Sequence, residues 1–352
     1  VSPGFIDAHS HGDGIFGKDY GQLCKINQGV TTEVCGQCGS SFYPVNKETL
    51  PELKQLLSVI CPDFSEDMEN WKDFSTYKKH LEKIPLAVNT AIFIGHSAIR
   101  IAVMGFENRK ATPDELEKMK AMLKEAMEEG SLGMSTGLIY PPGSFSDVDE
   151  LVELAKVMVP YDGIYASHLR NESSNLVDAV KEALEIGQRA GVRVQLSHHK
   201  AYGKKNWGAS KETLRLVNEA IANGQKVTLD QYPYEASMTH FNVLLPPKYF
   251  AGGIGSAADS LKNSKIREII KSEILDENCK FDNYYQNCRG FNGIFAAVLP
   301  HTPEYNGMFV PEIAGKMNKD PFETYFNLVT LNHGEGTGIY FSMGEEDLTR
   351  II

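Results

Sequence analysis

Short apolar runs alternate along this chain with longer stretches in which apolar residues recur every three or four positions. Short runs rich in β-branched residues are typical of buried strands, and the longer spacing is typical of amphipathic helices. The predicted strand segments are residues 4–8, 31–35, 90–94, 132–136, 163–167, 192–197 and 226–230. Because strands and helices alternate over this length, the pattern predicts parallel strands joined by crossover helices.

The helices between these strands carry recognisable end signals. Thr112 is followed by Pro113 and then by Glu115, which is the pattern of a capped helix start with proline in the first turn. Gly130 follows the expected end of the same helix, where glycine is favoured. These signals place a complete helix between two of the predicted strands.

Seven strands in this alternation nearly fill an eight-stranded barrel. We therefore predict an α/β fold, a TIM-like (β/α)8 barrel that is incomplete at its C-terminal end. Residues 1–239 are expected to form barrel strands, residues 240–311 a small inserted α/β subdomain, and residues 312–352 a return to the barrel. The eighth strand is expected either at residues 338–343 or beyond Ile352, and the second position is favoured.

The composition narrows the class of protein further. A net charge of -11 opposes binding to phosphate backbones, so no nucleic-acid partner is expected. Six cysteines in 352 residues are too few for a disulfide scaffold and are expected to be reduced thiols. The sequence contains neither a signal-like start nor an apolar run of about 18 residues. We expect a soluble, cytoplasmic protein without a membrane partner, and the pattern leaves the oligomeric state open.

Two histidines directly follow the first apolar strand. Residues two apart in a strand point to the same side, so His9 and His11 are expected to project together. Two neutral imidazoles on one side supply half of a metal site. The alternative is that both are solvated loop histidines, which the adjoining strand disfavours.

A C-x-x-C pair, Cys35 and Cys38, ends the second strand and enters a glycine-rich loop. Such pairs also occur in redox motifs and in zinc knuckles. A four-cysteine zinc site is disfavoured because the sequence has no second C-x-x-C. The loop is expected to carry Cys38 to the barrel mouth, where a thiolate is able to bridge two metal ions. Cys35 is better explained as a buried thiol of the core.

Two more histidines end later strands. His168 and His198 lie 30 residues apart, which is the length of one strand-helix unit. Neighbouring barrel strands would therefore present both side chains at the carboxyl end, where polar residues of barrels are usually catalytic. A lone histidine at a strand end is more often a core residue. The matching positions of these two, together with His9 and His11, favour metal ligands.

Three further residues are expected to lie near the site without binding metal. His199 must point away from its neighbour His198 in a strand, so a structural role is expected. His96 also ends a strand and is expected near the site without being a ligand. Asp7 faces the same side as His9, where a carboxylate is able to orient a ligand imidazole. A structural role inside the barrel is the alternative for Asp7.

Lys200 and Tyr232 are the candidate substrate-binding residues. Lys200 lies two positions after His198, shares its side of the strand and is able to bind an anion. Tyr232 follows the seventh strand with Tyr234 nearby, and these tyrosines either line a substrate pocket or cap the barrel.

Several motifs together resemble the amidohydrolase superfamily, and more closely its D-aminoacylase (N-acyl-D-amino-acid deacylase) branch. The resemblance is specific because the motifs fall in the same order from residue 1 to about residue 240, and it returns near Gly338. The motifs are Pro3-Gly4-Phe5-Ile6-Asp7-Ala8-His9-Ser10-His11, Gly36-Gln37-Cys38-Gly39, Gly95-His96-Ser97, Gly133-Met134-Ser135-Thr136-Gly137, His168-Leu169-Arg170-Asn171-Glu172, Ser197-His198-His199-Lys200 and Asp230-Gln231-Tyr232-Pro233-Tyr234.

The resemblance implies a barrel of the metal-dependent hydrolase type with zinc as its cofactor. One tight ion would be held by Cys38, His168 and His198. A second, weaker ion would be held by His9 and His11 and would share the cysteine.

The resemblance also implies the reaction, which is hydrolysis of the amide bond of N-acyl-D-amino acids to a carboxylate and a free D-amino acid. The partner is then a small N-acyl amino acid whose carboxylate is gripped by Lys200 and Tyr232. The family also uses a general-base aspartate in a Gly-Ser-Asp-like motif, which is absent here and is expected beyond Ile352. Since the chain begins at Val1 without Met, we expect a piece of a longer protein.

Two other functions stay open. A cyclic-amide hydrolase, such as a dihydroorotase or hydantoinase, usually bridges its metals with a carboxylated lysine on the fourth strand. Residues 132–136 contain no lysine, which disfavours this alternative. A metal-binding barrel without catalysis is the second alternative, and the missing general base is its support.

Overall fold

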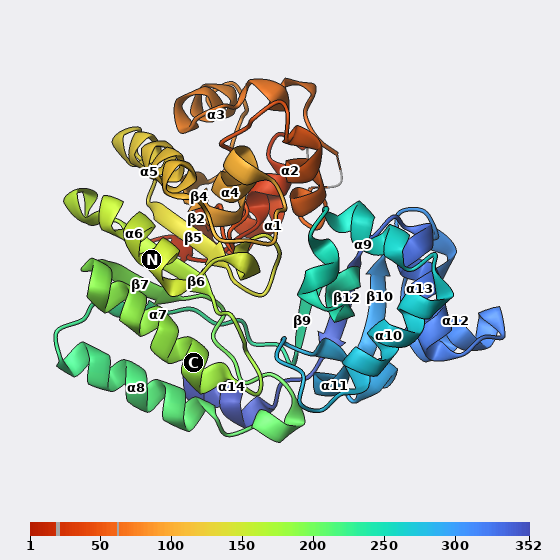
Figure 1. The fold of residues 1–352 in the computed structure, drawn as a ribbon. Helices are drawn as coiled ribbons and strands as arrows, with labels where there is room; N and C mark the ends of the chain where they lie inside the picture. The colour runs from red at the N-terminus through yellow and green to blue at the C-terminus, as the bar shows by residue number, and fades with distance from the viewer. Residues whose placement is uncertain (19–21, 62) are drawn as a thin grey trace. The chain divides into compact units, whose positions relative to one another are not determined.

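The computed structural model describes residues 1–18, 22–61 and 63–352, and Figure 1 shows their ribbon. The chain falls into two compact units. The first unit comprises Val1–Leu169, Val180–His198 and Leu216–Asp230, and the second comprises Arg170–Ala179, His199–Arg215 and Gln231–Ile352.

The first unit is built on parallel strands in two sheets. One sheet has the order β1-β2-β3 and the other has the order β4-β5-β6-β7-β8. The strands are β1 (Phe5–Asp7), β2 (Val30–Cys35), β3 (Asn89–Ile92), β4 (Ile94–Gly95), β5 (Gly133–Gly137), β6 (Ile164–His168), β7 (Arg193–Leu196) and β8 (Val227–Leu229).

Every described strand pair in these two sheets is parallel. All seven predicted strand segments are found, and the third is divided into β3 and β4 at Phe93. The parallel α/β class is therefore confirmed. The described ladders leave two separate sheets, so closure into a (β/α)8 barrel stays a prediction.

Helices follow the strands in regular alternation, as Figure 1 shows from β5 to α8. They are α1 (Leu23–Ile26), α2 (Leu50–Leu57), α3 (Phe74–Leu81), α4 (His96–Met104), α5 (Pro113–Glu128), α6 (Val148–Val157), α7 (Leu176–Ala190) and α8 (Ser210–Ala222). The predicted start of α5 is confirmed, because Thr112 and Glu115 each accept a hydrogen bond from the other's backbone N–H. Gly130 follows the helix end with a positive φ of 103°.

The core of the first unit lies between the sheet β4–β8 and its helices. Met134, Tyr165 and Val194 come from three adjacent strands and are almost completely buried. Leu123 of α5 and Leu151 of α6 are equally buried. Each such side chain stabilises the fold by about 1.5–3 kcal/mol relative to exposure, so this packing fixes where the strand ends lie.

The second unit contains an antiparallel sheet of order β11-β10-β12-β9. Its strands are β9 (Ala236–His240), β10 (Ile294–Val298), β11 (Met308–Phe309) and β12 (Thr337–Phe341), and its helices include α9 (Ile254–Ser260), α10 (Ser264–Leu275), α11 (Tyr284–Asn287), α12 (Val310–Met317), α13 (Pro321–Leu331) and α14 (Glu345–Ile351). Buried aromatic rings pack in its core, where the ring centroids of Phe241 and Tyr325 are 5.3 Å apart.

This arrangement corrects part of the predicted organisation. The segment 338–343 was one candidate for the eighth parallel strand, but β12 pairs antiparallel with both β9 and β10. The predicted boundaries at residues 239 and 311 stay a prediction. Residues 231–352 lie in one unit together with two earlier segments, because β9, β10 and β12 share one sheet.

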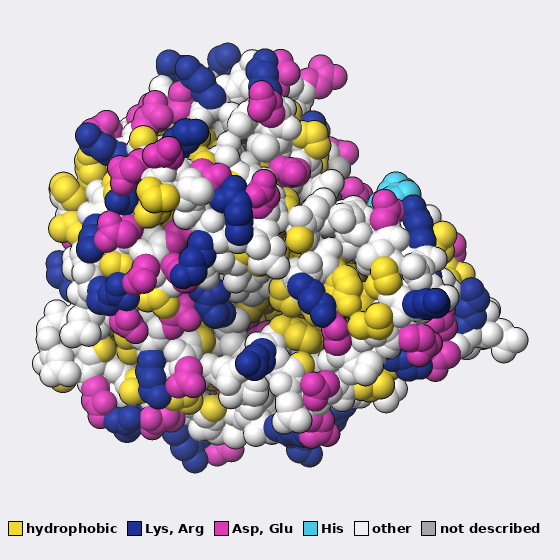
Figure 2. Space-filling view, in the orientation of Figure 1, with side chains coloured by type: hydrophobic (Ala, Val, Ile, Leu, Met, Phe, Trp, Pro, Cys, Tyr) yellow, Lys and Arg dark blue, Asp and Glu magenta, His cyan; other side chains and the backbone are white. Residues whose placement is uncertain are grey.

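On the face drawn in Figure 2, acidic and basic side chains are interspersed. Within the described residues, every helix is too short or too polar to span a lipid bilayer.

A buried ionic network ties α4 to α6 in the first unit. Arg100 is completely buried, and its Nη1 donates to both carboxylate oxygens of Glu150 at 2.7 and 2.5 Å. His96 Nε2 lies 2.9 Å from the same carboxylate, so this histidine has a partner in the core. Burial raises the pKa of Glu150, but His96 and Arg100 outweigh burial and lower it to about 2.

Replacing Glu150 by Gln should lower the free energy of unfolding at neutral pH by roughly 3 kcal/mol or more, because Arg100 stays buried without its counter-charge. The folded-state pKa lies below the usual 4.5, so the stabilisation is complete above about pH 4.5 and is lost as the pH falls toward 2. Denaturant unfolding between pH 2 and pH 7 measures both effects.

Glu153→Gln on the same helix is the matched control. Glu153 pairs with Lys156 and Lys120 at the surface, where such pairs contribute about 1 kcal/mol or less. Equal losses in the Glu150 and Glu153 variants would show that the buried network does not stabilise the fold.

Candidate metal centre

The carboxyl ends of β1, β2, β6 and β7 bring five predicted ligands into one cluster of the first unit. Parallel strands end at the same edge of a sheet, and the register aligns Gly137 of β5 with His168 of β6. Two triads form there, and within each triad the potential ligand atoms all lie within 4.8 Å of one another. The triads are His9, His11, Cys38 and Cys38, His168, His198.

Cys38 is common to both triads. Its Sγ lies 3.4 Å from Nε2 of His9 and 3.4 Å from Nε2 of His198. Two nitrogen or sulfur ligands of one tetrahedral zinc ion, each ~2.0–2.3 Å from it, stand about 3.5 Å apart. The observed spacings therefore fit cysteine and histidine ligands of tetrahedral zinc.

The backbone is strained at two of these ligands. Cys38 has a φ of 55° and His198 a φ of 36°, both in the left-handed region that side chains other than glycine rarely adopt. Such conformations cost of order 1–3 kcal/mol and concentrate at functional sites, where the surrounding structure holds them in place.

Glycines on both sides of Cys38 make its loop possible. Gly36 and Gly39 have positive φ angles of 71° and 76°. A Cβ on Gly36 would lie 2.2 Å from the carbonyl oxygen of Phe93, and one on Gly39 would lie 2.8 Å from the nitrogen of Gly137. The loop is thus pressed against neighbouring backbone on both flanks, which fixes the position of the thiol.

Buried polar groups also anchor the Cys38 loop. Asp13 accepts a hydrogen bond from the backbone N–H of Gly36 at 3.1 Å, and burial raises the pKa of Asp13 to about 7. Glu33 of β2 is also buried and accepts hydrogen bonds from Ser10 at 2.9 Å and Gln22 at 2.6 Å. These contacts join the segment after β1 and the residue before α1 to β2 and the Cys38 loop.

The charges of the ligands depend on one further residue, Asp230. Its Oδ1 lies 3.1 Å from Nδ1 of His9. Burial lowers the pKa of His9, but Cys38 and Asp230 outweigh burial and raise it to about 10. Burial raises the pKa of Asp230, but His9 and His198 lower it to about 2. In contrast, burial and the charge of His9 lower the pKa of His11 to about 3, which leaves its imidazole neutral.

The two predicted substrate-binding residues meet in the second unit. Lys200 Nζ lies 5.6 Å from the ring centroid of Tyr232 and donates to Oε1 of Glu172 at 2.6 Å. Lys200 and Glu172 are both 2% exposed, so the lysine charge is already balanced by a buried carboxylate. Asp282 accepts a hydrogen bond from the backbone N–H of Glu172 at 2.8 Å, and burial raises its pKa to about 6.

Known proteins resemble this chain in sequence and in structure. A sequence model of the amidohydrolase family matches residues 1–261 of this chain. The chain belongs to the amidohydrolase family.

Curated relatives match over the whole chain. The D-aminoacylase of Alcaligenes xylosoxydans xylosoxydans is 40% identical over 352 residues, which are 100% of this chain and 62% of that protein. The N-acyl-D-glutamate deacylase of the same organism is 37% identical over 352 residues, which are 100% of this chain and 61% of that protein. The chain therefore spans about three fifths of the length of these relatives.

Solved amidohydrolase structures are also similar. The N-acyl-D-glutamate deacylase of Bordetella bronchiseptica contains zinc and a phosphonate that mimics the tetrahedral intermediate. It matches with a TM-score of 0.80 at 29% identity and covers 99% of this chain and 62% of its own. A D-aminoacylase structure matches with a TM-score of 0.76 at 33% identity, over 99% of this chain and 62% of its own.

Sequence reasoning about this amidohydrolase missed Asp230, the carboxylate beside His9. Asp7 was one candidate to orient the His9 imidazole, with a structural role as the alternative. Its carboxylate pairs with Lys25 and, at His9, accepts only the backbone N–H, at 3.2 Å. The carboxylate beside the imidazole is that of Asp230. The available signal was its position directly after β8, at the same strand edge as the ligands.

The lesser predictions can be placed as well. His199 is buried in the second unit, and its Nε2 lies 2.8 Å from Oγ1 of Thr213, as a structural role requires. Cys35 is completely buried, and burial raises its pKa well above the usual value, which fits an inert core thiol. Apart from its place in the motif His168-Leu169-Arg170-Asn171-Glu172, nothing in the sequence indicated that Glu172 pairs with Lys200.

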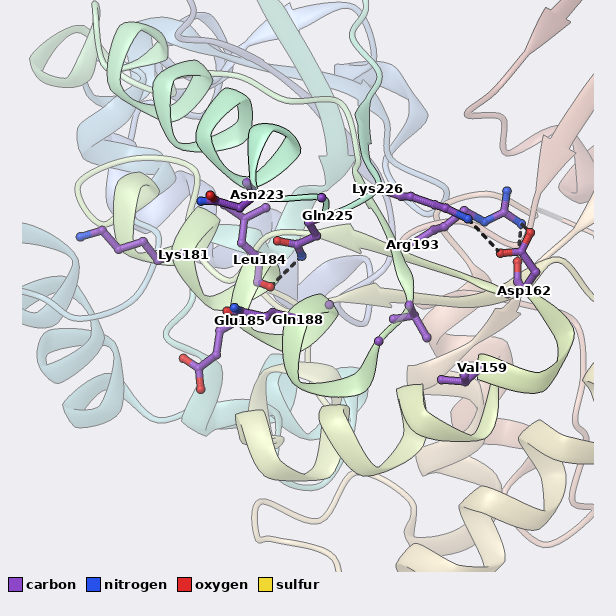
Figure 3. Close-up of a pocket in the computed structure, with 16 residues that line it drawn as sticks. Val159, Asp162, Lys181, Leu184, Glu185, Gln188, Arg193, Asn223, Gln225 and Lys226 are labelled. Atoms are coloured by element: carbon purple, nitrogen blue, oxygen red, sulfur yellow. Dashed lines mark hydrogen bonds and ion pairs between the residues drawn. The ribbon is translucent and has the colours of Figure 1, made fainter.

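A pocket of about 670 Å³ lies at the opposite end of the same strands. Figure 3 shows Asp162 before β6, Arg193 at the start of β7 and Lys226 before β8, with Asp162 paired to both cations. Since β6, β7 and β8 are parallel, these residues lie at the amino ends and the metal ligands at the carboxyl ends. The pocket is therefore separate from the candidate centre.

Replacing Gly39 by Ala should displace the Cys38 loop, because the new Cβ would meet the nitrogen of Gly137 at 2.8 Å. The free energy of unfolding should fall by more than the ~1–2 kcal/mol that left-handed backbone alone costs an alanine. Alkylation of Cys38, which is 8% exposed in the native loop, should become faster, as measured by peptide mapping.

Gly191→Ala is the control that separates the cost of left-handed backbone from the steric clash with Gly137. Gly191 has nearly the same φ, 77°, but nothing lies within 4 Å of a Cβ built there. Its variant should show only the backbone cost and an unchanged rate of Cys38 alkylation. If both variants behave alike, contact with Gly137 does not position the loop.

Proposed function

We propose that this chain is the metal-binding part of a zinc-dependent deacylase that hydrolyses the amide bond of N-acyl-D-amino acids. The products are a carboxylate and a free D-amino acid. The observation that carries this proposal is the pair of triads that meet at Cys38 Sγ. The chain spans 62% of the related D-aminoacylase, so the activity is proposed for a protein that contains this chain.

Zinc fits the donor set, because one thiol and four imidazoles are ligands that zinc prefers. Cys38, His168 and His198 would hold the tighter ion, and His9 and His11 with the same cysteine would hold a weaker one. Support for this order comes from burial, since all three residues of the first set are buried whereas His9 and His11 are partly exposed. When bound, zinc supplies Lewis-acid chemistry, which polarises the acyl carbonyl and activates water.

The substrate carboxylate is proposed to bind at Lys200 and Tyr232. The support is their mutual contact and the positive charge of the lysine. Because an ammonium group has three N–H donors, the ion pair with Glu172 does not by itself exclude a second carboxylate.

The general base is not assigned to a residue of this chain. Asp230 is a carboxylate at the strand edge, but its oxygens already contact His9, His198 and Gln195. A group held by that many partners is poorly placed to carry a proton between water and a leaving nitrogen. In the proposed enzyme this role therefore belongs to another carboxylate.

For the fold, we propose that the two parallel sheets belong to one TIM-like (β/α)8 barrel. The support is the uniform parallel pairing and the TM-score of 0.80 to a solved deacylase. Residues 240–311 are proposed to form the small subdomain of that enzyme.

A cyclic-amide hydrolase is a weaker alternative. Its bridging lysine would stand on β5, which reads Gly133-Met134-Ser135-Thr136-Gly137. In this position Ser135 instead accepts a hydrogen bond from the backbone N–H of Gly39 at 3.0 Å and so supports the Cys38 loop. In the proposed site, the Cys38 thiol would take the role that a carboxylated lysine has in those enzymes.

The function is tested with the longer protein that contains this chain. Zinc-loaded enzyme is incubated with N-acetyl derivatives of D- and L-amino acids, and the release of free amine is measured. We expect hydrolysis of the D-series, with little release from the L-series. Hydrolysis of hydantoins or dihydroorotate instead would support the cyclic-amide alternative, and zinc binding without any hydrolysis would support the non-catalytic one.

The shared thiolate predicts the metal content of variants. Cys38→Ala should lose both ions because the cysteine belongs to both triads, whereas His168→Ala and His11→Ala should each lose one. Elemental analysis after dialysis measures the zinc per chain. Cys24→Ala, which removes an exposed thiol, is the control and should keep the zinc content of the parent chain. Unchanged zinc in Cys38→Ala would refute the ligand assignment.

A further inference from the structure

Asp230 contacts one residue from each triad. It lies directly after β8, in the first unit, and its side chain is 15% exposed. Oδ1 accepts a hydrogen bond from the backbone N–H of His198 at 2.7 Å and lies 3.1 Å from Nδ1 of His9. One oxygen atom is therefore placed between a residue that follows β1 and a residue that follows β7.

The contact with His198 holds a strained backbone. His198 has a φ of 36°, a conformation that needs support from its surroundings. A charged acceptor forms a stronger hydrogen bond with a backbone N–H than a neutral one does. Asp230 thus supplies such support at the residue whose ring must face the thiol of Cys38.

The contact with His9 determines which ring nitrogen is available. Nδ1 lies 3.1 Å from Oδ1 of Asp230, whereas Nε2 lies 3.4 Å from Cys38 Sγ. A histidine binds a metal through a nitrogen without a proton, and a carboxylate beside the other nitrogen keeps the proton there. The arrangement leaves Nε2 as the atom directed at the shared thiol.

The carboxylate is itself held in place. Its second oxygen accepts a hydrogen bond from Nε2 of Gln195 on β7 at 2.6 Å. With one oxygen fixed by β7, the carboxylate cannot rotate away from His9 and His198 without breaking a buried contact. Asp7 offers no such geometry, because its carboxylate pairs with Lys25.

We propose that Asp230 is a positioning residue shared by the two metal triads, which fixes the proton of His9 on Nδ1 and the backbone of His198. This inference rests on the zinc sites of the proposed function. It assigns a role to the final residue of the first unit that no ligand set includes.

Two substitutions of Asp230 separate its two contacts. Asn keeps an oxygen that is able to accept from His198 N–H but removes the charge beside His9, whereas Ala removes both contacts. Asp230→Asn should weaken binding of the ion at His9 and His11 by about 10–100-fold and change the tighter site little. Asp230→Ala should weaken both. Zinc titration against a chromophoric chelator measures the two affinities on the full chain.

Asp7→Asn is the matched control, because it removes a carboxylate near His9 that contacts only the backbone of that residue. Both of its zinc affinities should stay close to those of the parent chain, because the His9 ring keeps its contact with Asp230.

A readout without metal keeps the role of Asp230 separate from the zinc proposal. In the metal-free chain, the Nδ1 proton of His9 should be protected from exchange with water and shifted downfield in ¹H–¹⁵N spectra. Asp230→Asn should remove that protection, and Asp7→Asn should preserve it. A merely structural aspartate would not produce this pattern.

The outcomes are distinct. A chain that binds no zinc but shows a protected Nδ1 proton refutes the proposed metal function and supports the contact of Asp230 with His9. A chain that binds two ions equally well with Asp230 or Asn overturns the positioning role. An unprotected Nδ1 proton in the parent chain also overturns it, and this test holds even if the variants fail to fold.

Discussion

The candidate site depends on the position of one sulfur atom. Cys38 Sγ belongs to both triads and lies 3.4 Å from an imidazole nitrogen in each. Holding it there requires a left-handed cysteine between two glycines that are pressed against neighbouring backbone. Strand register, buried acids under the loop and the hydrogen bond from Gly39 to Ser135 all serve the same constraint. The Cys38 loop therefore has an unfavourable backbone conformation, and many small contacts of the first unit stabilise it.

Sequence patterns predicted the strands and the clustering of the five candidate ligands because these are local signals. A period of two places His9 and His11 on one side, and each strand ends where its apolar run ends. The sequence patterns did not identify which carboxylate lies beside the His9 ring. Asp7 lies two residues from His9, whereas Asp230 reaches the same ring from a strand far along the chain. Pairings of this kind depend on how strands are brought together, and the sequence carries no local mark of them. The same reason hid Glu172 and the antiparallel pairing of β12.

The two ends of the parallel strands have different character. At the carboxyl ends, the loops bear the candidate ligand side chains and strained backbone. At the amino ends, a wide pocket is crossed by ion pairs among exposed residues such as Asp162 and Arg193, which stabilise little. Substitutions should consequently be tolerated at the amino ends of β6, β7 and β8 and should be restricted at the carboxyl ends, as expected where chemistry is confined to one face of a fold.

The separation of the ligands along the chain has a consequence for how the protein folds. Cys38 and His198 are 160 residues apart in sequence, and Cys38 and His9 are 29 apart. Closing such long loops costs entropy before any metal ligand bond forms, and parallel strands pair slowly for the same reason. Because the candidate ligands follow strands of both parallel sheets, they come together only as these sheets assemble. Zinc would thus stabilise a framework that has already formed, in contrast to small zinc domains, in which the metal initiates folding.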